Sequence, residues 1–106
     1  MKKVSVFFAD GCEEVEALTV VDLLRRAGVE TDMVSITGKL LVTSSHGVGI
    51  QTDQLFEETD FEETDMLVLP GGMPGTLHLQ AHEGLTQLLK AYDLSLIHIS
   101  EPTRPY

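Results

Sequence analysis

Cysteine is almost absent from this sequence, since Cys12 is the only one among 106 residues. A single thiol excludes an internal disulfide bond and a zinc site built from cysteines. Cys12 follows a predicted strand, and its acidic neighbours Glu13 and Glu14 are expected to raise its pKa, because negative charge disfavours the thiolate. We therefore predict that Cys12 is a packed side chain and not a nucleophile.

Basic residues are also scarce. The chain has 7 Lys and Arg residues against 17 Asp and Glu residues, which gives a net charge of -10. This excess disfavours nucleic acids and anionic membranes as partners. Much of it lies between residues 57 and 65, where the acidic residues and nearby phenylalanines form a solvated amphipathic pattern. We therefore predict no calcium or magnesium site there, and no metal centre elsewhere in the chain.

Long apolar runs are missing as well. No stretch approaches the length needed to cross a bilayer, and Lys2 and Lys3 precede a strand-like pattern instead of the core of a signal peptide. We therefore expect a cytoplasmic protein. Tryptophan is absent, but 42% of the residues are hydrophobic, which suffices for one small domain folded around a core.

The first third of the chain predicts a β-α-β unit. Residues 4–8 form a short apolar strand, and a helix is expected to start between residues 13 and 16, where carboxylates suit the positive end of the helix dipole. Apolar residues at three- and four-residue spacing continue this helix as far as Gly28, which is a typical C-terminal residue. Residues 29–36 then form the next strand, and the short connection favours a parallel sheet.

A second strand-to-turn unit follows later in the sequence. The unbroken apolar run from Met66 to Leu69 predicts a strand buried on both faces, and Pro70 ends it. Gly71 and Gly72 then lie beyond the carboxyl end of the strand, where an open α/β sheet binds its ligands. Paired glycines bring bare N–H groups close to a substrate or a developing negative charge, although an ordinary strand-to-helix turn also contains them.

Histidines occur in two further segments. Two strand-like runs within residues 39–52 predict a hairpin with His46 at its tip, where a histidine is either a solvated side chain or a functional group. His78 and His82 lie at or before a predicted helix over residues 82–92. Their spacing of four would suit a metal, but no third ligand accompanies them, so we interpret them as surface residues.

Four segments together resemble the DJ-1/PfpI superfamily, also called ThiJ/PfpI, and in particular its bacterial DJ-1-like branch. The resemblance covers residues 2 to about 92 in the correct order, which corresponds to the amino-terminal half of a family member. Several spaced motifs that agree are far more specific than any one of them. The segments are Phe-Ala-Asp-Gly-Cys-Glu-Glu-Val-Glu-Ala at 8–17, Val-Asp-Leu-Leu-Arg-Arg-Ala-Gly at 21–28, Ser-Ser-His-Gly at 44–47 and Asp-Met-Leu-Val-Leu-Pro-Gly-Gly at 65–72.

The resemblance implies a flavodoxin-like three-layer α/β sandwich with a mainly parallel sheet, related to class I glutamine amidotransferases, and a homodimer. Members use a thiolate cysteine on a strained strand-to-helix elbow, without a cofactor. Glu16 matches the glutamate that hydrogen-bonds this thiol, and the alternative for it is a helix-start carboxylate that faces water. Gly71 and Gly72 match the oxyanion pocket. His46 and Arg26 match positions near the pocket and are candidate substrate-binding residues.

The activity implied by the resemblance is glyoxalase or protein deglycase chemistry on small reactive carbonyls or their protein adducts. The alternative is a non-enzymatic redox-protective or chaperone-like protein of the same fold, and an older family label is thiazole monophosphate biosynthesis. The fold alone would also permit a nucleotide- or flavin-binding module. However, the Gly-Gly-Met-Pro-Gly turn lacks the hydroxyl- and amide-rich loop that a phosphate needs.

The sequence departs from the family after about Asp93. The family continues into another buried strand and the cysteine elbow, and neither the elbow nor the following half of the sheet is present in this sequence. Residues 94–104 instead match the translation of a transposase adapter that is used to prepare DNA sequencing libraries. We therefore interpret residues 1–93 as the amino-terminal part of a truncated DJ-1/PfpI domain and residues 94–106 as a non-native tail, and we expect the chain itself to be inactive. The alternative is that the apolar alternation from Leu94 to Ile99 forms the next strand.

Overall fold

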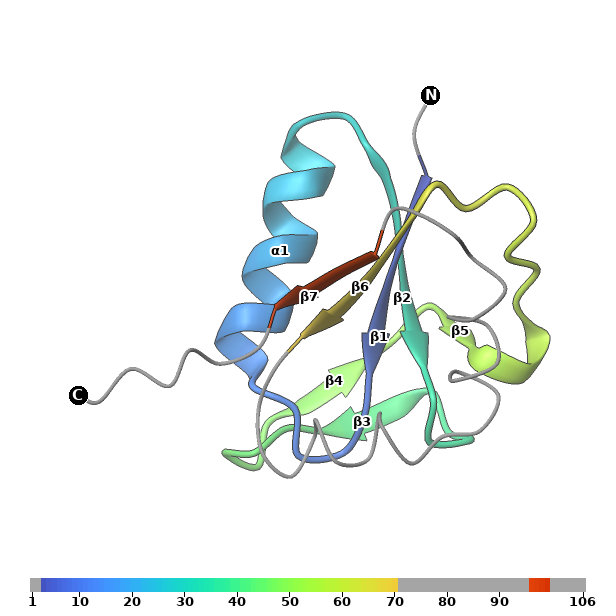
Figure 1. Ribbon diagram of the computed structural model, residues 1–106. Coiled ribbons are helices and arrows are strands. Elements are labelled where there is room, and N and C mark those ends of the chain that lie inside the picture. The colour runs from blue at the N-terminus through green and yellow to red at the C-terminus, as the bar shows by residue number, and fades with distance from the viewer. Residues whose placement is uncertain (1–2, 71–95, 100–106) are drawn as a thin grey trace.

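The computed structural model describes residues 3–70 and 96–99 of the chain (Figure 1). In this part the main sheet has five strands in the order β5-β2-β1-β6-β7, and each neighbouring pair is parallel. The predicted α/β class with a parallel sheet is therefore confirmed. The strands are β1 (Lys3–Phe8), β2 (Glu30–Ser35), β5 (Gln54–Leu55), β6 (Met66–Pro70) and β7 (Leu96–Ile99).

The central strands β1 and β6 are apolar because both of their faces are covered. Val6 pairs with Val68 across the β1–β6 ladder, and both side chains are almost fully buried. Phe7, the next residue of β1, points to the opposite face and is also fully buried. This burial on two sides explains why both strands read as continuous hydrophobic runs without alternation.

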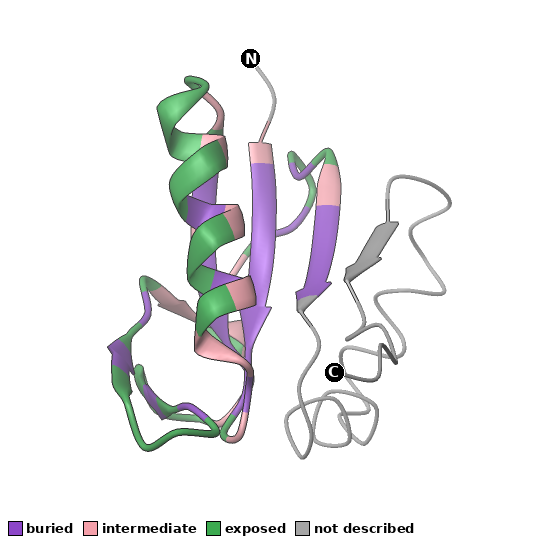
Figure 2. Cartoon of the chain, turned by 90° about the vertical axis from the view of Figure 1, so that its left-hand side faces the viewer, coloured by how far each residue is buried: buried purple, intermediate pink, exposed green. Residues whose placement is uncertain are grey.

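Helix α1 (Glu14–Arg26) covers one face of the sheet, as Figure 2 shows. Glu13 caps its first turn by accepting a hydrogen bond from the backbone N–H of Val15 (2.8 Å). Gly28 follows its end with a φ of 83°, which a residue with a side chain rarely adopts. Both ends of the helix therefore agree with the prediction. The core between helix and sheet includes Val4, Val6, Phe8, Cys12, Ala17, Val21, Met33, Val42, Ile50 and Val68.

Aromatic side chains cover part of the other face. Phe7 of β1 lies 5.8 Å from Phe61 and 6.1 Å from Phe56, measured between ring centroids. Phe61 is only 9% exposed, so the segment rich in acidic residues turns its rings into the core and its charges outward. The short strand β5 and the 3-10 helix η1 (Phe56–Glu58) within this region were not predicted, because elements of two or three residues carry no detectable periodicity.

The predicted hairpin is present and consists of β3 (Leu41–Thr43) and β4 (Gly49–Gln51), which pair in antiparallel orientation. Gly47 has a φ of 79° in the connecting turn, a conformation that would strain any other L-residue. Its N–H donates to the carbonyl of Ser44 (3.0 Å) and closes the turn beside His46.

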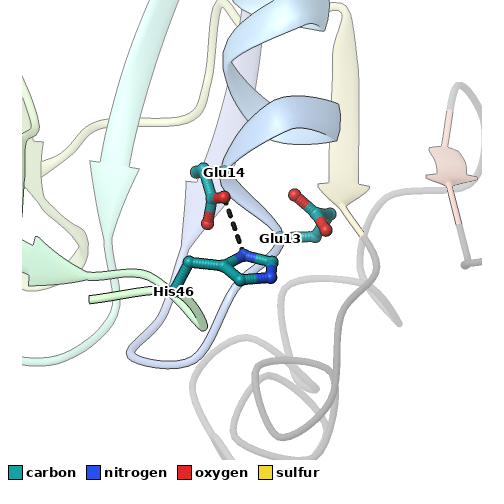
Figure 3. A group of neighbouring side chains, drawn as sticks. All are labelled: Glu13, Glu14 and His46. Atoms are coloured by element: carbon teal, nitrogen blue, oxygen red, sulfur yellow. Dashed lines mark hydrogen bonds and ion pairs between the residues drawn. The ribbon is translucent and has the colours of Figure 1, made fainter. Parts of the chain in front are cut away.

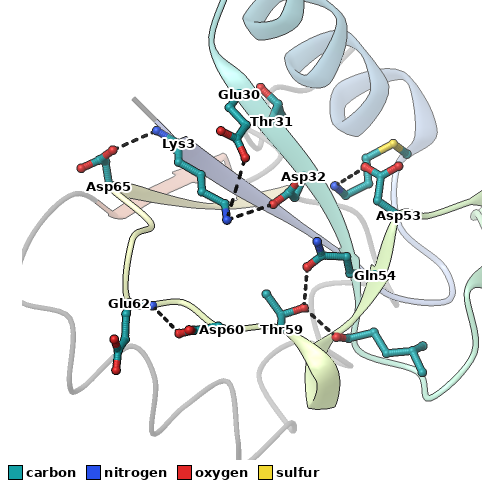
Figure 4. A network of polar contacts seen from close by, with 12 residues as sticks. Lys3, Glu30, Thr31, Asp32, Asp53, Gln54, Thr59, Asp60, Glu62 and Asp65 are labelled. Atoms are coloured by element: carbon teal, nitrogen blue, oxygen red, sulfur yellow. Dashed lines mark hydrogen bonds and ion pairs between the residues drawn. The ribbon is translucent and has the colours of Figure 1, made fainter. Parts of the chain in front are cut away.

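A polar network holds together the amino ends of three strands (Figure 4). The Lys3 ammonium lies 3.7 Å from the carboxylate of Asp32 and 3.9 Å from that of Glu30. The backbone N–H of Lys3 donates to the side chain of Asp65 (2.8 Å) just before β6. These acidic residues therefore have structural partners at the end of the sheet opposite to His46.

Several sequence-based predictions fall outside the described residues, namely Gly71, Gly72, His78, His82 and the helix over residues 82–92. Within the described part, β7 pairs with β6 in parallel, with Leu67 opposite Leu96. The structure therefore has a strand within residues 94–99, as the alternative interpretation of this segment predicted. No helix in the described ranges combines the length and the apolar character that crossing a membrane requires.

Candidate functional site

The candidate site lies where β1 ends and α1 begins, at the carboxyl ends of the parallel strands. Three hydrogen bonds fasten the β3–β4 hairpin to this loop. The Gly11 N–H donates to the carbonyl of Thr43 (2.8 Å), and the Thr43 N–H donates to the side chain of Asp10 (3.0 Å). The Ser45 N–H donates to the carbonyl of Cys12 (2.8 Å). The hairpin tip therefore has a fixed position beside the first turn of α1.

His46 reaches from this tip to the helix, as Figure 3 shows. Its Nδ1 lies 2.8 Å from Oε2 of Glu14. The Glu14 side chain is 15% exposed, whereas that of His46 is 66% exposed. The two residues are 32 positions apart in the sequence, and no local pattern links them. Sequence reasoning identified Glu14 only as a helix-start residue and missed this contact.

The Glu14 carboxylate is stabilised in its charged form. Its pKa lies below the ordinary value of 4.5, chiefly because the hydroxyl of Ser44 stabilises the carboxylate, and the nearby His46 adds to the effect. Burial acts in the opposite direction but does not outweigh these contacts. Ser44 is itself 5% exposed and belongs to the β3–β4 hairpin, which hydrogen bonds fix to the loop before α1. Glu14 is therefore an anion at neutral pH, held between two elements.

Glu13 completes a group of three possible metal-ligating side chains. One ligand atom from each of Glu13, Glu14 and His46 lies within 4.8 Å of the other two. In Figure 3 the carboxylates of Glu13 and Glu14 lie on either side of the His46 ring. The expectation from the sequence that the chain has no metal centre stays a prediction.

Glu16, the candidate proton-sharing residue, lies in the first turn of α1 and is partly buried, with Oε1 shielded from solvent. The water-facing alternative therefore does not describe this atom. Gly71 and Gly72 lie outside the described residues, so the oxyanion pocket stays a prediction.

Arg26 lies far from His46 within one chain. It occupies the last residue of the 13-residue helix whose first residue is Glu14, so about 18 Å of helix separates the two backbone positions. Its guanidinium pairs with Asp22 (3.0 Å) on the exposed side of the helix. The structure thus does not unite the two candidate substrate-binding residues in a single chain, and the role of Arg26 stays a prediction.

Cys12 has the character expected for a packed residue. It is 1% exposed and belongs to the core beneath α1. Burial raises its pKa to about 11, and the negative charges of Glu14 and Asp10 contribute to the increase. The increase in the pKa of Cys12 was predicted correctly, but its main cause is burial. Among the acidic neighbours, Asp10 and Glu14 contribute to the increase, whereas Glu13 and Glu14 were expected to.

Comparisons with known proteins agree with this architecture. The sequence profile of the DJ-1/PfpI family matches residues 2–95. Protein DJ-1 homolog B from Arabidopsis thaliana is 33% identical over 92 residues, and a protein named a deglycase, from Thermococcus kodakarensis, is 38% identical over 71 residues. The structure of oxidized Toxoplasma gondii DJ-1 superimposes with a TM-score of 0.82 at 37% identity.

These matches cover most of this chain but only part of each relative. They span 87%, 66% and 86% of the chain and 21%, 42% and 50% of the Arabidopsis, Thermococcus and Toxoplasma proteins, respectively. The chain therefore corresponds to the amino-terminal part of these proteins and has their flavodoxin-like α/β fold in truncated form. On the strength of the profile match and the shared fold, the chain belongs to the DJ-1/PfpI family.

Proposed function

We propose that this chain is the amino-terminal part of a cysteine-dependent enzyme of the glyoxalase or protein deglycase type. Its substrates would be small reactive carbonyls such as methylglyoxal, or their adducts with proteins, and no cofactor is needed. The observation that carries the proposal is the family match over residues 2–95, which includes Glu16 in the first turn of α1. A relative named a deglycase supports the reaction class.

In the proposed first step, a cysteine beyond residue 93 supplies the thiolate. Its sulfur forms a bond to the aldehyde carbon of the substrate, and the electron pair of the C=O bond moves to oxygen. The N–H groups of Gly71 and Gly72 stabilise this oxyanion, and a proton from Glu16 converts it to the hydroxyl of a hemithioacetal. Glu16 acquires that proton from the same thiol when the thiolate forms, so the step is balanced.

We also propose that the native domain continues differently after residue 93 and that residues 94–106 are a non-native tail. The parallel pairing of β7 with β6 is compatible with a native strand and with a non-native tail. A short apolar segment of either origin can pair with the open edge of a neighbouring strand. We expect residues 1–106 by themselves, whose single cysteine is the buried Cys12, to be inactive.

The full-length native protein, obtained from the native gene, tests the function. We expect it to consume methylglyoxal, and we expect Glu16→Gln to lower kcat about 100-fold or more, the usual range for removing a general acid or base. Glu57→Gln, which removes an exposed carboxylate from η1, is the matched control and should retain full activity. Absence of turnover in the native full-length protein would contradict the enzyme and favour the redox-protective or chaperone-like alternative.

The full-length protein is further proposed to be a cytoplasmic homodimer. Large apolar side chains remain exposed on two neighbouring elements: Val15 (65%) on α1, and Leu41 (57%) and Val48 (43%) on the hairpin. Exposed apolar side chains on these two elements support a protein interface on the side of the molecule that carries His46.

A further inference from the structure

Three ligating side chains meet at the start of α1 and the tip of the hairpin, and none of them takes part in the covalent step proposed above. We propose that Glu13, Glu14 and His46 form a binding site for one divalent transition-metal ion such as Zn²⁺. The site joins α1 to the β3–β4 hairpin, and it is independent of the proposed catalytic cysteine.

The geometry requires only small movements. Oε2 of Glu14 and Nδ1 of His46 are 2.8 Å apart, whereas two ligands of a tetrahedral zinc ion with bonds of about 2.0–2.1 Å lie about 3.3 Å apart. The ion would thus replace the proton that now joins these atoms, after they separate by roughly half an ångström. The ligand atom of Glu13 lies within 4.8 Å of both. Rotation of this side chain would bring it to the ion at the expense of its 2.8 Å capping bond from the Val15 N–H.

The ligand set matches the charge and chemistry of such an ion. Two carboxylates balance a divalent charge, and an imidazole favours Zn²⁺, Cu²⁺ or Ni²⁺ over Mg²⁺ and Ca²⁺, which prefer oxygen ligands alone. Three protein ligands leave a fourth position for water in a tetrahedral complex. The 66% exposure of His46 gives the ion access from solvent.

The surroundings provide a second indication of a ligand. The Ser44 hydroxyl and His46 both stabilise the Glu14 carboxylate, but its buried Oε1 accepts no hydrogen bond of good geometry within the described ranges. Buried carboxylate oxygens normally have a partner, and a cation bound at this carboxylate would compensate its charge. The site is also held in place, because backbone hydrogen bonds from Gly11 and Ser45 fasten the hairpin to the loop before α1.

Zinc titration of the 106-residue chain, stripped with a chelator and followed by calorimetry, tests the proposal. We expect one equivalent of Zn²⁺ to bind, with affinity lowered about tenfold or more in His46→Ala and in Glu13→Gln. His82→Ala and Glu57→Gln are the controls for loss of a histidine and of a carboxylate, and they should bind as the unmodified chain does. Far-UV circular dichroism before each titration selects variants with the unmodified fold.

A spectroscopic readout keeps the test informative if one variant does not fold. Zn²⁺ should shift the imidazole NMR resonances of His46 at equimolar metal, and millimolar Mg²⁺ should not reverse the shift. The proposal is wrong if no stoichiometric binding occurs, if His46→Ala binds normally, or if His82→Ala abolishes binding. None of these outcomes bears on methylglyoxal turnover, so the two proposals fail separately.

Discussion

Side chains from two distant segments meet at the start of α1, where Glu13 and Glu14 lie close to His46 of the hairpin. The acidic character of Glu13 and Glu14 was enough to predict the start of α1, because helix dipoles favour carboxylates there. Their convergence with His46 was not predictable, since it depends on how the hairpin docks through Gly11 and Ser45. Glu16 was found only through the family resemblance, because its local pattern is that of any helix-start carboxylate.

The lowered pKa of Glu14 predicts a specific pH dependence of stability. Because its pKa is lower in the folded than in the unfolded chain, the carboxylate stabilises the fold above about pH 4.5 and loses this contribution as the pH falls through the folded-state value. Urea unfolding in the presence of a chelator should therefore show a weaker loss of stability below pH 4.5 in Glu14→Gln than in the unmodified chain. Glu57→Gln controls for the change in net charge, and parallel curves for Glu14→Gln and the unmodified chain would refute the assignment.

The raised pKa of Cys12 predicts low reactivity in the folded state. A pKa of about 11 against the ordinary 9.0 lowers the thiolate fraction at neutral pH about 100-fold, and burial blocks access as well. Iodoacetamide should therefore label Cys12 rapidly only after unfolding in urea, as followed by mass spectrometry. Equal labelling rates in folded and unfolded chains would show that the thiol is exposed.

Among the secondary-structure elements, those with clear periodicity were predicted and the shortest were not. Apolar spacing identified α1, β1, β2 and β6, and Gly28 and Gly47 marked the helix end and the hairpin turn. By contrast, β5 and η1 form because the Phe56 and Phe61 rings pack on Phe7. That is a tertiary contact, which a window of a few residues does not contain.

Asp53 links three elements and should be important for stability. Its Oδ2 accepts hydrogen bonds from the guanidinium of Arg25 in α1 and from the N–H of Met33 in β2, each at 2.8 Å. Asp53→Ala leaves the Met33 N–H without its side-chain acceptor and should lower the free energy of unfolding by about 1–3 kcal/mol.

Urea unfolding measures this loss, and Asp22→Ala is the matched control. Asp22 pairs with Arg26 on the helix surface, where both side chains are mostly exposed, so its removal should cost only about 0.5 kcal/mol. Equal costs for the two substitutions would contradict a linking role for Asp53.

For the whole molecule, the parallel α/β architecture followed from the sequence because its β-α-β unit and buried central strand have few alternative arrangements. Gly71 and Gly72 were identified from their place after a buried strand, whereas their proposed role in an oxyanion pocket and the nucleophile could be inferred only from the family. Their positions depend on polypeptide that follows β6, and the chain spans half or less of the compared relatives.

The proposed homodimer predicts that a charge on the hairpin weakens association. In the full-length protein, Leu41→Lys places an ammonium among exposed apolar side chains and should raise the dimer dissociation constant about tenfold or more, because a charge is costly in a desolvated contact. Sedimentation velocity across a dilution series measures the change. Glu63→Lys adds the same side chain to an exposed site in another segment and should leave the dimer intact, whereas an unmodified protein that is monomeric at all concentrations would refute the interface.

We propose that residues 1–93 belong to a family domain whose nucleophile lies in the polypeptide that naturally follows. Direct sequencing of the genomic locus, without adapter-based library preparation, tests it most directly. We expect an open reading frame that differs from the printed sequence after about codon 93 and encodes an apolar strand followed by a cysteine at a strand-to-helix turn. A genomic sequence that encodes residues 94–106 as printed, followed by a stop codon, would contradict it.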